Sequence, residues 1–400
     1  MHGLVDPVRS LRRMSAPARS RFPGVRNGWA RFDGPAGTQM VDAAITAMAE
    51  FAASGDNANC HGAFEAADRS DAVLERARAS VARLLGAPDA QHVWFGANMT
   101  TMTLAFTRGV AATLRPGDRV VGTRLDHDAN VSPWRIACEA SGAEHALAGF
   151  DGDTGLLDAA DVIDLIDGRT RWVAVTGASN LLGTTVDLAP IVAAAHAAGA
   201  RVYVDAVHLA PHRSIDVAAL GVDALVTSPY KWYGPHAGAM YLTPELMNGW
   251  PVAKVRPAPD EGPRRWETGT PSFEALAAVD AAARYLVDEG LERIGAEEAV
   301  VGTALLEGLA AIPGVRVHGS PTMAQRVPTV AFTVNGRRPD EVASALAADR
   351  IAVWAGHSYA VEAVGQLGLA ASGGVVRAGV VRYVDLDDAA RLLDAVRRLA

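Results

Sequence analysis

Lysine is almost missing from this sequence of 400 residues. Lysine and arginine together number 37, and only Lys231 and Lys254 are lysines, so 35 of these residues are arginines. The chain therefore supplies its positive charge through arginine, and a retained lysine calls for a reason of its own. Lysine can lose its proton and act as a nucleophile or base, whereas the arginine guanidinium stays protonated.

Cysteine is also scarce, since only Cys60 and Cys138 occur. Two cysteines exclude a disulfide framework and a paired metal motif, and they indicate a reducing, cytoplasmic setting. No apolar run reaches the roughly 20 residues of a membrane span. The arginine-rich start lacks the apolar core of a secretory signal, so we interpret it as a flexible arm or a subunit-contact segment. The formal charge of −8 argues against a nucleic-acid binder and favours a protein that handles small molecules.

A chain of this length is expected to form at least two units. Short apolar runs alternate with longer amphipathic stretches from about residue 88 to 245, which predicts a mostly parallel sheet with helices on both faces. The expected strands are 92–95, 119–123, 171–176, 201–207, 223–228 and 237–243, and the expected helices are 99–114, 133–142 and 189–199. Polar clusters follow several of these strands, at the edge where ligands collect in such sheets.

The last third of the chain has a different pattern, typical of a smaller α+β unit. It follows a Pro-, Gly- and Arg-rich joining loop at 255–271. We expect helices at 276–289, 292–311, 339–348 and 387–399, and strands at 314–318, 328–334, 350–354 and 375–381.

Lys231 stands in the apolar, glycine-spaced segment ALVTSPYKWYGPHAGAMYL, directly after an expected strand. A lysine that extends its charge to solvent is the simpler interpretation. A lysine that forms a Schiff base is the hypothesis we favour, because arginine cannot do this. Asp205 ends the strand VYVD and lies 26 residues earlier, so it is expected one βα step away. Its carboxylate can cap a helix, or it can pair with a protonated pyridine nitrogen.

Other polar groups at strand ends suit the same cofactor. The run FGANMTTMTL places a glycine turn before a helix, which predicts a phosphate cradle or an ordinary helix cap. Ser228 and the run TGT at 268–270 offer further donors. His127 can stack on a ring and shuttle protons as a catalytic residue, or it can act as a cap or a metal ligand. No second ligand follows at a zinc-like spacing, so no metal is expected. Arg377, in an apolar strand, suits a substrate carboxylate or a structural ion pair.

The ordered motifs resemble those of the class V (fold type I) aminotransferases, in the cysteine desulfurase-like branch. The resemblance runs from about residue 30 to the C-terminus. It rests on FDGPAGTQ, NANCHGAF, GANMTT, DHDANVSPW, SNLLGTT, VDAVH, TSPYKWYGP, ETGTP and VRAGVVRY. It implies an α/β fold in which a large domain with a mostly parallel seven-stranded sheet precedes a smaller α+β domain. We expect an N-terminal arm at 1–30, the large domain at 31–270 and the small domain at 271–400.

The resemblance also implies the cofactor, pyridoxal 5′-phosphate, and a role for each matching residue. Lys231 matches the lysine that binds the cofactor, Asp205 matches the partner of the pyridine nitrogen, and His127 matches the ring-stacking histidine. The further cofactor-binding positions are Ala97, Asn98, His208, Ser228 and Tyr230. Gly269 and Thr270 match contacts donated by a neighbouring subunit, which implies a homodimer with shared active sites. Asn180 and Arg377 match positions near the substrate carboxylate.

One departure from the family concerns the reaction. Cysteine desulfurases accept sulfur on a cysteine in a mobile loop, and the corresponding run here is VWAGHSYA at 353–360. Tyr359 takes the cysteine position and Trp354 the position of an arginine. A phenol cannot form a persulfide, so sulfur transfer by that route is not expected. Cys60 lies in a loop that the family places near the active site, and we interpret it as a packed side chain.

We therefore expect a lyase that acts on an amino acid through an external aldimine and Cα deprotonation, with loss of a β- or γ-substituent. Tyr359 is expected to assist departure of the leaving group or to close the pocket. Transamination and epimerisation use the same early chemistry and remain alternatives. A catalytically silent protein that kept the fold is a further alternative, against which the intact Lys231, Asp205 and Arg377 argue.

Overall fold

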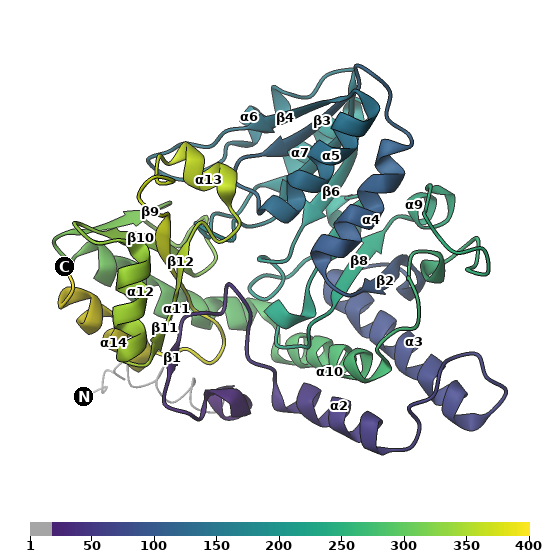
Figure 1. Cartoon of the computed structure of the whole chain (residues 1–400), viewed down its shortest axis with the longest axis horizontal. Helices are drawn as coiled ribbons and strands as arrows, with labels where there is room; N and C mark the ends of the chain where they lie inside the picture. Colours follow the sequence, from purple (N-terminus) through teal and green to yellow (C-terminus); the bar gives the residue numbers. More distant parts are fainter. Residues whose placement is uncertain (1–17) are drawn as a thin grey trace, which may run out of the picture.

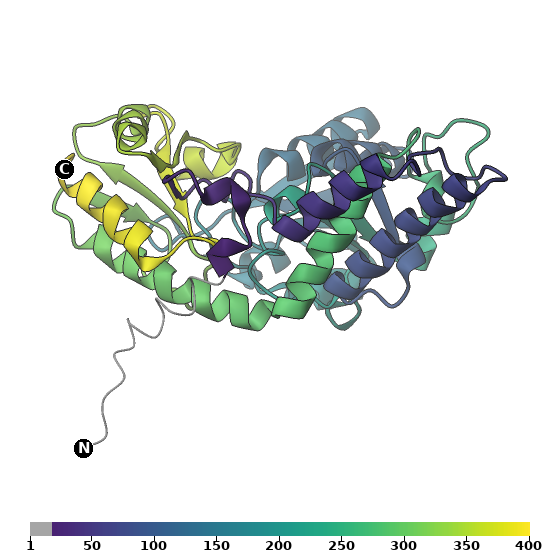
Figure 2. The same ribbon diagram turned by 90° about the horizontal axis from the view of Figure 1, so that it is seen from below.

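The structure is a computed structural model that describes residues 18–400. The first 17 residues of the expected arm lie outside the described residues. The rest forms two halves, each built around its own sheet, with helices α10 (Phe273–Glu289) and α11 (Leu291–Ala310) following one another beneath both (Figures 1 and 2). In the part of the chain that the structure describes, no helix is both long and apolar enough to cross a membrane.

The larger half contains a seven-stranded sheet with the order β2-β8-β7-β6-β5-β3-β4. Neighbouring strands are parallel except β8, which runs antiparallel to both β2 and β7. The strands are β2 (Val93–Gly96), β3 (Arg119–Thr123), β4 (Glu144–Ala148), β5 (Thr170–Thr176), β6 (Arg201–Asp205), β7 (Ala224–Thr227) and β8 (Gly238–Leu242). The predicted mostly parallel α/β fold is confirmed.

Helices cover both faces of this sheet, which explains the continuous apolar character of its strands. In β5, Trp172 and Ala174 pack into one core, whereas Val173 and Val175 pack into the other. The core with Trp172 is aromatic, and its centre is Phe106, whose ring lies 5.3 Å from that of Trp172. The helices of this half are α2 (Asp42–Ala53), α3 (Glu65–Leu85), α4 (Met99–Ala111), α5 (Ser132–Ser141), α6 (Ala159–Ile163), α7 (Leu188–Ala197), α8 (Val217–Leu220) and α9 (Pro244–Gly249).

The smaller half contains a four-stranded antiparallel sheet with the order β12-β13-β10-β9. Its strands are β9 (Val315–His318), β10 (Thr329–Val334), β12 (Trp354–Gly356) and β13 (Val375–Gly379). Helices α12 (Pro339–Ala348), α13 (Val361–Gln366) and α14 (Leu386–Arg397) complete it together with α11.

The expected strand 350–354 is wrong as a single element. It divides into β11 (Ile351–Ala352), which pairs with β1 (Ala30–Arg31), and β12, which pairs with β13 in the four-stranded sheet. The chain changes its pairing partner at Val353, because the N-terminal strand β1 pairs with the first half of the segment 350–354. Residues 30–31 therefore lie with the C-terminal half, although α2 packs on α10 beside the large sheet.

Candidate active site

A pocket opens at the carboxyl ends of the central parallel strands, where β5, β6 and β7 end side by side. Eight of the predicted site residues line it: Asn98, His127, Asn180, Asp205, His208, Ser228, Tyr230 and Lys231. They come from segments up to 133 positions apart, between 98 and 231. The predicted convergence of polar groups at this edge is therefore present in the structure.

Lys231 enters the pocket from the short 3-10 turn η4 (Pro229–Lys231) that follows β7. Its Nζ donates a hydrogen bond to the carbonyl oxygen of Pro35 and lies 5.1 Å from the centre of the Tyr230 ring. Burial and the nearby Arg377 guanidinium lower the pKa of this amine to about 7, although Asp205 acts in the opposite direction. The lysine therefore faces the pocket rather than open solvent, and a large fraction of it is unprotonated near neutral pH.

Asp205 is the last residue of β6 and is only 4% exposed. Its Oδ1 accepts a hydrogen bond from the Val207 amide at 2.9 Å, in the turn that follows the strand; no helix begins here, so Asp205 is not a helix cap. Oδ2 has no hydrogen-bond donor among the described residues and remains available to the pocket. Burial raises the pKa of the carboxyl to about 6, so the carboxylate form is available above that pH.

His127 is held by the turn η3 (Asp128–Asn130), where its Nδ1 accepts a hydrogen bond from the Ala129 amide at 3.0 Å. Burial, followed by the positive charges of Lys231 and Arg377, lowers the pKa of this imidazole to about 4. The ring is therefore neutral at neutral pH, with Nε2 carrying its proton because Nδ1 is the acceptor. A neutral, flat ring at the pocket wall suits stacking on an aromatic cofactor.

The N-terminus of α4 lies at the pocket, where its first backbone N–H groups can donate hydrogen bonds. Asn98 caps this helix by accepting from the Thr101 amide at 2.9 Å, and Met99 and Thr100 line the pocket beside it. Strand β8 approaches closely here, because a Cβ on Gly238 would lie 2.7 Å from the Asn98 carbonyl carbon. A helix N-terminus of this kind favours an anion such as phosphate.

Buried polar atoms that lack a hydrogen-bond partner indicate whether the residues of the pocket fit pyridoxal phosphate. The Ser228 hydroxyl is buried at the pocket wall without a hydrogen-bond partner among the described residues. A buried hydroxyl without a partner costs free energy unless a ligand satisfies it. The N-terminus of α4 can hold the phosphate, Asp205 can hold the ring nitrogen, and Lys231 can bond to the aldehyde carbon. Together these groups fit pyridoxal phosphate.

Asn180 and Arg377 form a second group of unsatisfied atoms. Arg377, in β13, is 4% exposed and donates from Nη1 to the Asn180 carbonyl oxygen at 2.7 Å. Its Nε and the Asn180 Oδ1 are both buried without a partner, and no described carboxylate pairs with the guanidinium. The competing interpretation, a structural ion pair, is therefore not found in residues 18–400. The two residues also join the two halves of the molecule.

Five predicted site residues do not line this pocket: Arg377, which lies beside Asn180 as described above, and Ala97, Gly269, Thr270 and Tyr359. Ala97, Gly269 and Thr270 line a separate, largely apolar cavity of about 430 Å³ together with Trp94 and Trp266. Tyr359 is 65% exposed, and its ring stacks on that of His127 at 5.3 Å with an angle of 22°. His127 therefore has the pocket on one side and Tyr359 on another.

His208 contacts the smaller half from the pocket wall. Its Nε2 hydrogen bonds with the Thr329 hydroxyl at 2.9 Å, and burial lowers the pKa of the imidazole well below its ordinary value. Thr329 is the first residue of β10, so this bond also links the two sheets.

Sequence reasoning missed Asp126, which lies behind His127. This carboxyl is 1% exposed, accepts from Asn130 Nδ2 at 2.7 Å and bonds with the Thr123 hydroxyl at 2.5 Å. Burial, with a smaller contribution from the negative charge of Asp205, raises its pKa to about 8. The signal in the sequence was an acidic residue next to the predicted histidine, in a segment otherwise expected to be a loop.

A cluster away from the pocket was also not predicted. Cys60, His61 and Asp71 place three possible ligand atoms within 4.8 Å of one another. Arg264 lies among them, with Nη2 at 3.1 Å from the Cys60 sulfur and Nη1 at 3.8 Å from the Asp71 carboxylate. Because this guanidinium already supplies a positive charge, the cluster does not require a metal ion.

Comparisons with known proteins identify the family of the chain. The profile of the aminotransferase class-V family matches residues 31–392. A probable cysteine desulfurase of Mycolicibacterium paratuberculosis (strain ATCC BAA-968 / K-10) is 36% identical over 406 residues, which cover 96% of this chain and 58% of that protein. Probable cysteine desulfurase 1 of Mycobacterium leprae (strain TN) is 34% identical, over 92% of this chain and 62% of that protein.

Among solved structures, the apo cysteine desulfurase of Thermococcus onnurineus NA1 has a TM-score of 0.90 at 26% identity. The match covers 100% of this chain and 99% of that one. The chain thus spans about three fifths of the two relatives above, at 58% and 62%, and nearly all of the solved enzyme. With a family profile that extends over most of its length, the chain belongs to the class V aminotransferase family of pyridoxal phosphate enzymes.

Proposed function

We propose that this enzyme removes a β- or γ-substituent from an amino acid, as a lyase that does not form a protein persulfide. The observation that carries the proposal is that the pocket contains a base, Lys231, and Asn180 with Arg377 bonded behind it, but no thiol. The cysteine desulfurases among its relatives support a substrate that contains a carbon–sulfur bond.

The two thiols of the chain support this proposal by their positions. Cys138 is 1% exposed in α5, and burial raises the pKa of its thiol to about 12, so it is a poor nucleophile. Cys60 lies in the cluster with Arg264, and neither cysteine lines the cofactor pocket. The loop position that carries the sulfur acceptor in desulfurases holds Tyr359.

When bound, pyridoxal phosphate supplies an electron sink that stabilises negative charge at the Cα of an attached amino acid. In this chain, Lys231 is the base that removes the Cα proton, because its lowered pKa leaves the amine free to accept one. Asp205 would hold the ring nitrogen through Oδ2, to which no described residue donates. Loss of a β-substituent would break the Cβ–substituent bond while Lys231 holds the Cα proton, and loss of a γ-substituent would require Lys231 to take a further proton from Cβ.

The substrate carboxylate is held by Arg377 and Asn180 in this proposal. Their unsatisfied Nε and Oδ1 atoms offer a donor and an acceptor in a buried position next to the pocket. Binding there would orient the Cα–H bond towards Lys231 and replace the missing partner of the guanidinium. Tyr359 packs outside His127 and closes that side of the pocket.

A homodimer with shared sites is part of the proposal. It is supported by Gly269 and Thr270, which line a cavity separate from their own cofactor pocket and so remain available to a second subunit. A cytoplasmic location is supported by the two cysteines, both of which are free thiols.

The products formed from L-cysteine test the reaction. Elimination yields sulfide, ammonium and pyruvate, whereas desulfuration yields alanine and enzyme-bound sulfur. We expect pyruvate and ammonium in equal amounts, no alanine, and no activity in Lys231→Ala. Other amino acids with leaving groups at Cβ or Cγ are then screened by release of keto acid and ammonium.

Each other outcome has a distinct meaning. Alanine formed together with bound sulfur would contradict the proposal, and Cys60→Ser would show whether that thiol accepts the sulfur. A D-amino acid would indicate epimerisation, and amino-group transfer to an added keto acid would indicate transamination. A purified protein without the visible absorption of lysine-bound cofactor after reconstitution would indicate the silent alternative.

A further inference from the structure

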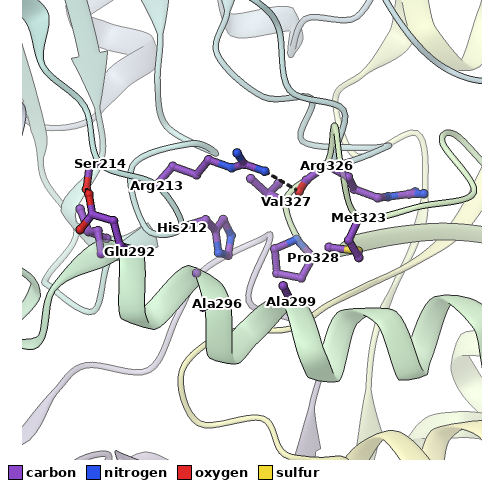
Figure 3. Close-up of a pocket in the computed structure, with 12 residues that line it drawn as sticks. His212, Arg213, Ser214, Glu292, Ala296, Ala299, Met323, Arg326, Val327 and Pro328 are labelled. Carbon is purple, nitrogen blue, oxygen red and sulfur yellow. Dashed lines mark hydrogen bonds between the residues drawn. The ribbon is translucent and has the colours of Figure 1, made fainter.

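A further cavity of about 430 Å³ lies at the junction of the two halves (Figure 3). Helix α11 forms its floor, the segment after β6 forms one wall, and the segment that leads into β10 forms the other. The cavity shares no lining residue with the cofactor pocket. Its size is within the range of sites that hold small molecules.

Three charged residues line this cavity: Arg213, Glu292 and Arg326. The Arg326 guanidinium is occupied by backbone carbonyl oxygens, whereas Arg213 and Glu292 carry opposite charges that do not pair with each other. Glu292 accepts a hydrogen bond from the Ser214 hydroxyl at 2.6 Å, and this bond lowers the pKa of its carboxyl. Arg213 donates only to the Arg326 carbonyl oxygen, at 3.3 Å. Neither Arg213 nor Glu292 forms an ion pair with any residue in the described range 18–400. A bound molecule that carries both charges can insert between them.

Most of the remaining lining is apolar. Ala296 and Ala299 lie on the floor, and Met323, Val327 and Pro328 close the far end. Gly295 permits helix α11 to approach this closely, because a Cβ there would lie 2.6 Å from the His212 carbonyl oxygen. The wall suits an aliphatic group of a few carbon atoms.

His212 adds one directed polar contact above Ala296 (Figure 3). Its Nδ1 is bonded to the buried Glu298 carboxylate at 2.6 Å, and Glu298 also accepts from the Tyr233 hydroxyl at 3.2 Å. The buried carboxylate fixes the orientation of the imidazole. Nε2 of His212 has no hydrogen-bond partner among the described residues and is the ring nitrogen left for a ligand.

We propose that this cavity binds a free aliphatic α-amino acid as a zwitterion, at a site separate from the cofactor pocket. Arg213 takes the carboxylate, Glu292 takes the ammonium group, and the apolar wall takes the side chain. The ligand contacts both halves of the molecule. It also lies beside the His212 ring, which is 5.7 Å from that of the cofactor-pocket residue His208.

Calorimetric titration of the cofactor-loaded enzyme with L-valine tests the site. We expect saturable binding that Arg213→Gln and Glu292→Gln each weaken at least tenfold. Ala299→Phe, which fills the cavity and leaves both charges in place, should abolish binding. Arg316→Gln and Glu307→Gln are matched controls, because both residues are exposed and lie outside the cavity, Glu307 on the same helix.

Probes that carry a single charge test the zwitterion. Isovalerate keeps the carboxylate and isobutylamine keeps the amine, and each should bind at least tenfold more weakly than L-valine. Equal binding of isovalerate would overturn the proposal in favour of a simple anion site.

Two further results would also overturn the proposal. One is the absence of any saturable heat with L-valine. The other is binding that is lost in Arg377→Gln but unchanged in Arg213→Gln, because the amino acid would then occupy the cofactor pocket instead.

Discussion

Lys231 and Asp205 face one pocket with pKa values that depart from the ordinary ones in opposite directions. Burial lowers the pKa of the amine to about 7 and raises that of the carboxyl to about 6. Both shifts bring the groups into the neutral range, where a base and a charged ring partner are needed together. The arrangement explains why this position holds one of the two lysines of the chain.

Lys231→Arg tests the need for a group that can lose its proton. Arginine keeps the positive charge and most of the length, so the pocket keeps its shape, but it cannot act as a base. We expect kcat to fall by at least about 100- to 10,000-fold, the range for loss of a general base. The visible absorption of bound cofactor should be lost as well.

Lys254→Arg is the matched control for this substitution. Lys254 pairs with Asp260 at 2.9 Å in the loop before α10, away from the pocket lining. Retained kcat in Lys231→Arg, or an equal loss in Lys254→Arg, would contradict the role we assign to Lys231.

At the scale of helices and strands, the loop between β12 and α13 connects the two halves of the molecule. Ser358 and Tyr359 adopt left-handed backbone conformations, with φ of 49° and 58°. The larger half holds both residues, because Asn180 donates to the Ser358 carbonyl and the Asp128 amide donates to that of Tyr359, each at 2.7 Å. Such conformations cost about 1–3 kcal/mol each and persist where the surroundings fix them.

Tyr359 is predicted to act through its ring rather than its hydroxyl. No described residue hydrogen bonds with the hydroxyl, whereas the ring stacks on His127. We expect Tyr359→Phe to keep kcat/KM within about twofold. We expect Tyr359→Ala to lower it up to about tenfold, as an aromatic pair is worth about 0.5–1.5 kcal/mol. A large loss in Tyr359→Phe would instead support a role for the phenol in leaving-group departure.

Gly238 is predicted to control how closely β8 approaches the N-terminus of α4. A Cβ at this position would contact backbone atoms of Asn98 and Met99 at 2.7 and 3.0 Å, so α4 must shift. Gly238→Ala should destabilise the fold by about 1–3 kcal/mol and weaken cofactor binding. Denaturant unfolding and cofactor titration measure the two effects. Gly249→Ala is the control, since nothing lies within 4 Å of that position.

Buried ionisable groups of two kinds determine how the stability of the whole molecule varies with pH. Burial lowers the pKa of His127, His145 and His318 to about 4, so their neutral forms stabilise the fold above pH 6.5, and this contribution is lost as pH falls. Asp126 has the opposite sign, because its pKa is raised to about 8 and the folded state holds a proton that the unfolded state releases. Its contribution is present at low pH and is lost as pH rises towards 8.

Asp126→Asn separates these two effects. Asparagine does not ionise, so the variant lacks the loss of stability that Asp126 causes between about pH 4 and pH 8. We expect the Tm of the variant, relative to that of the wild type, to rise steadily from pH 5 to pH 8. Parallel Tm curves would contradict the prediction. Asp153→Asn, at an exposed position, is the control and should give a constant difference.

Patterns in the sequence predict much of the architecture and the central site. Apolar runs identify the buried strands, and polar residues at strand ends identify the pocket, because both follow from burial and sheet geometry. Strand β4 was not predicted, since it lies at the sheet edge and only Ala148 at its end is fully buried. The contact of Tyr359 with His127 and the partner change at Val353 depend on how the two halves meet. Local sequence does not contain that information.

Because lysine is rare in this chain and Lys231 lies in the cofactor pocket, cleavage after lysine can report whether Lys231 carries the cofactor. Complete cleavage after lysine divides the unfolded chain without bound cofactor into the fragments 1–231, 232–254 and 255–400. Cofactor fixed to Lys231 by borohydride reduction blocks the first cut and leaves 1–254 intact. The ratio of the fragments 1–254 and 1–231 therefore measures the fraction of enzyme that carried its cofactor, with no assay of activity.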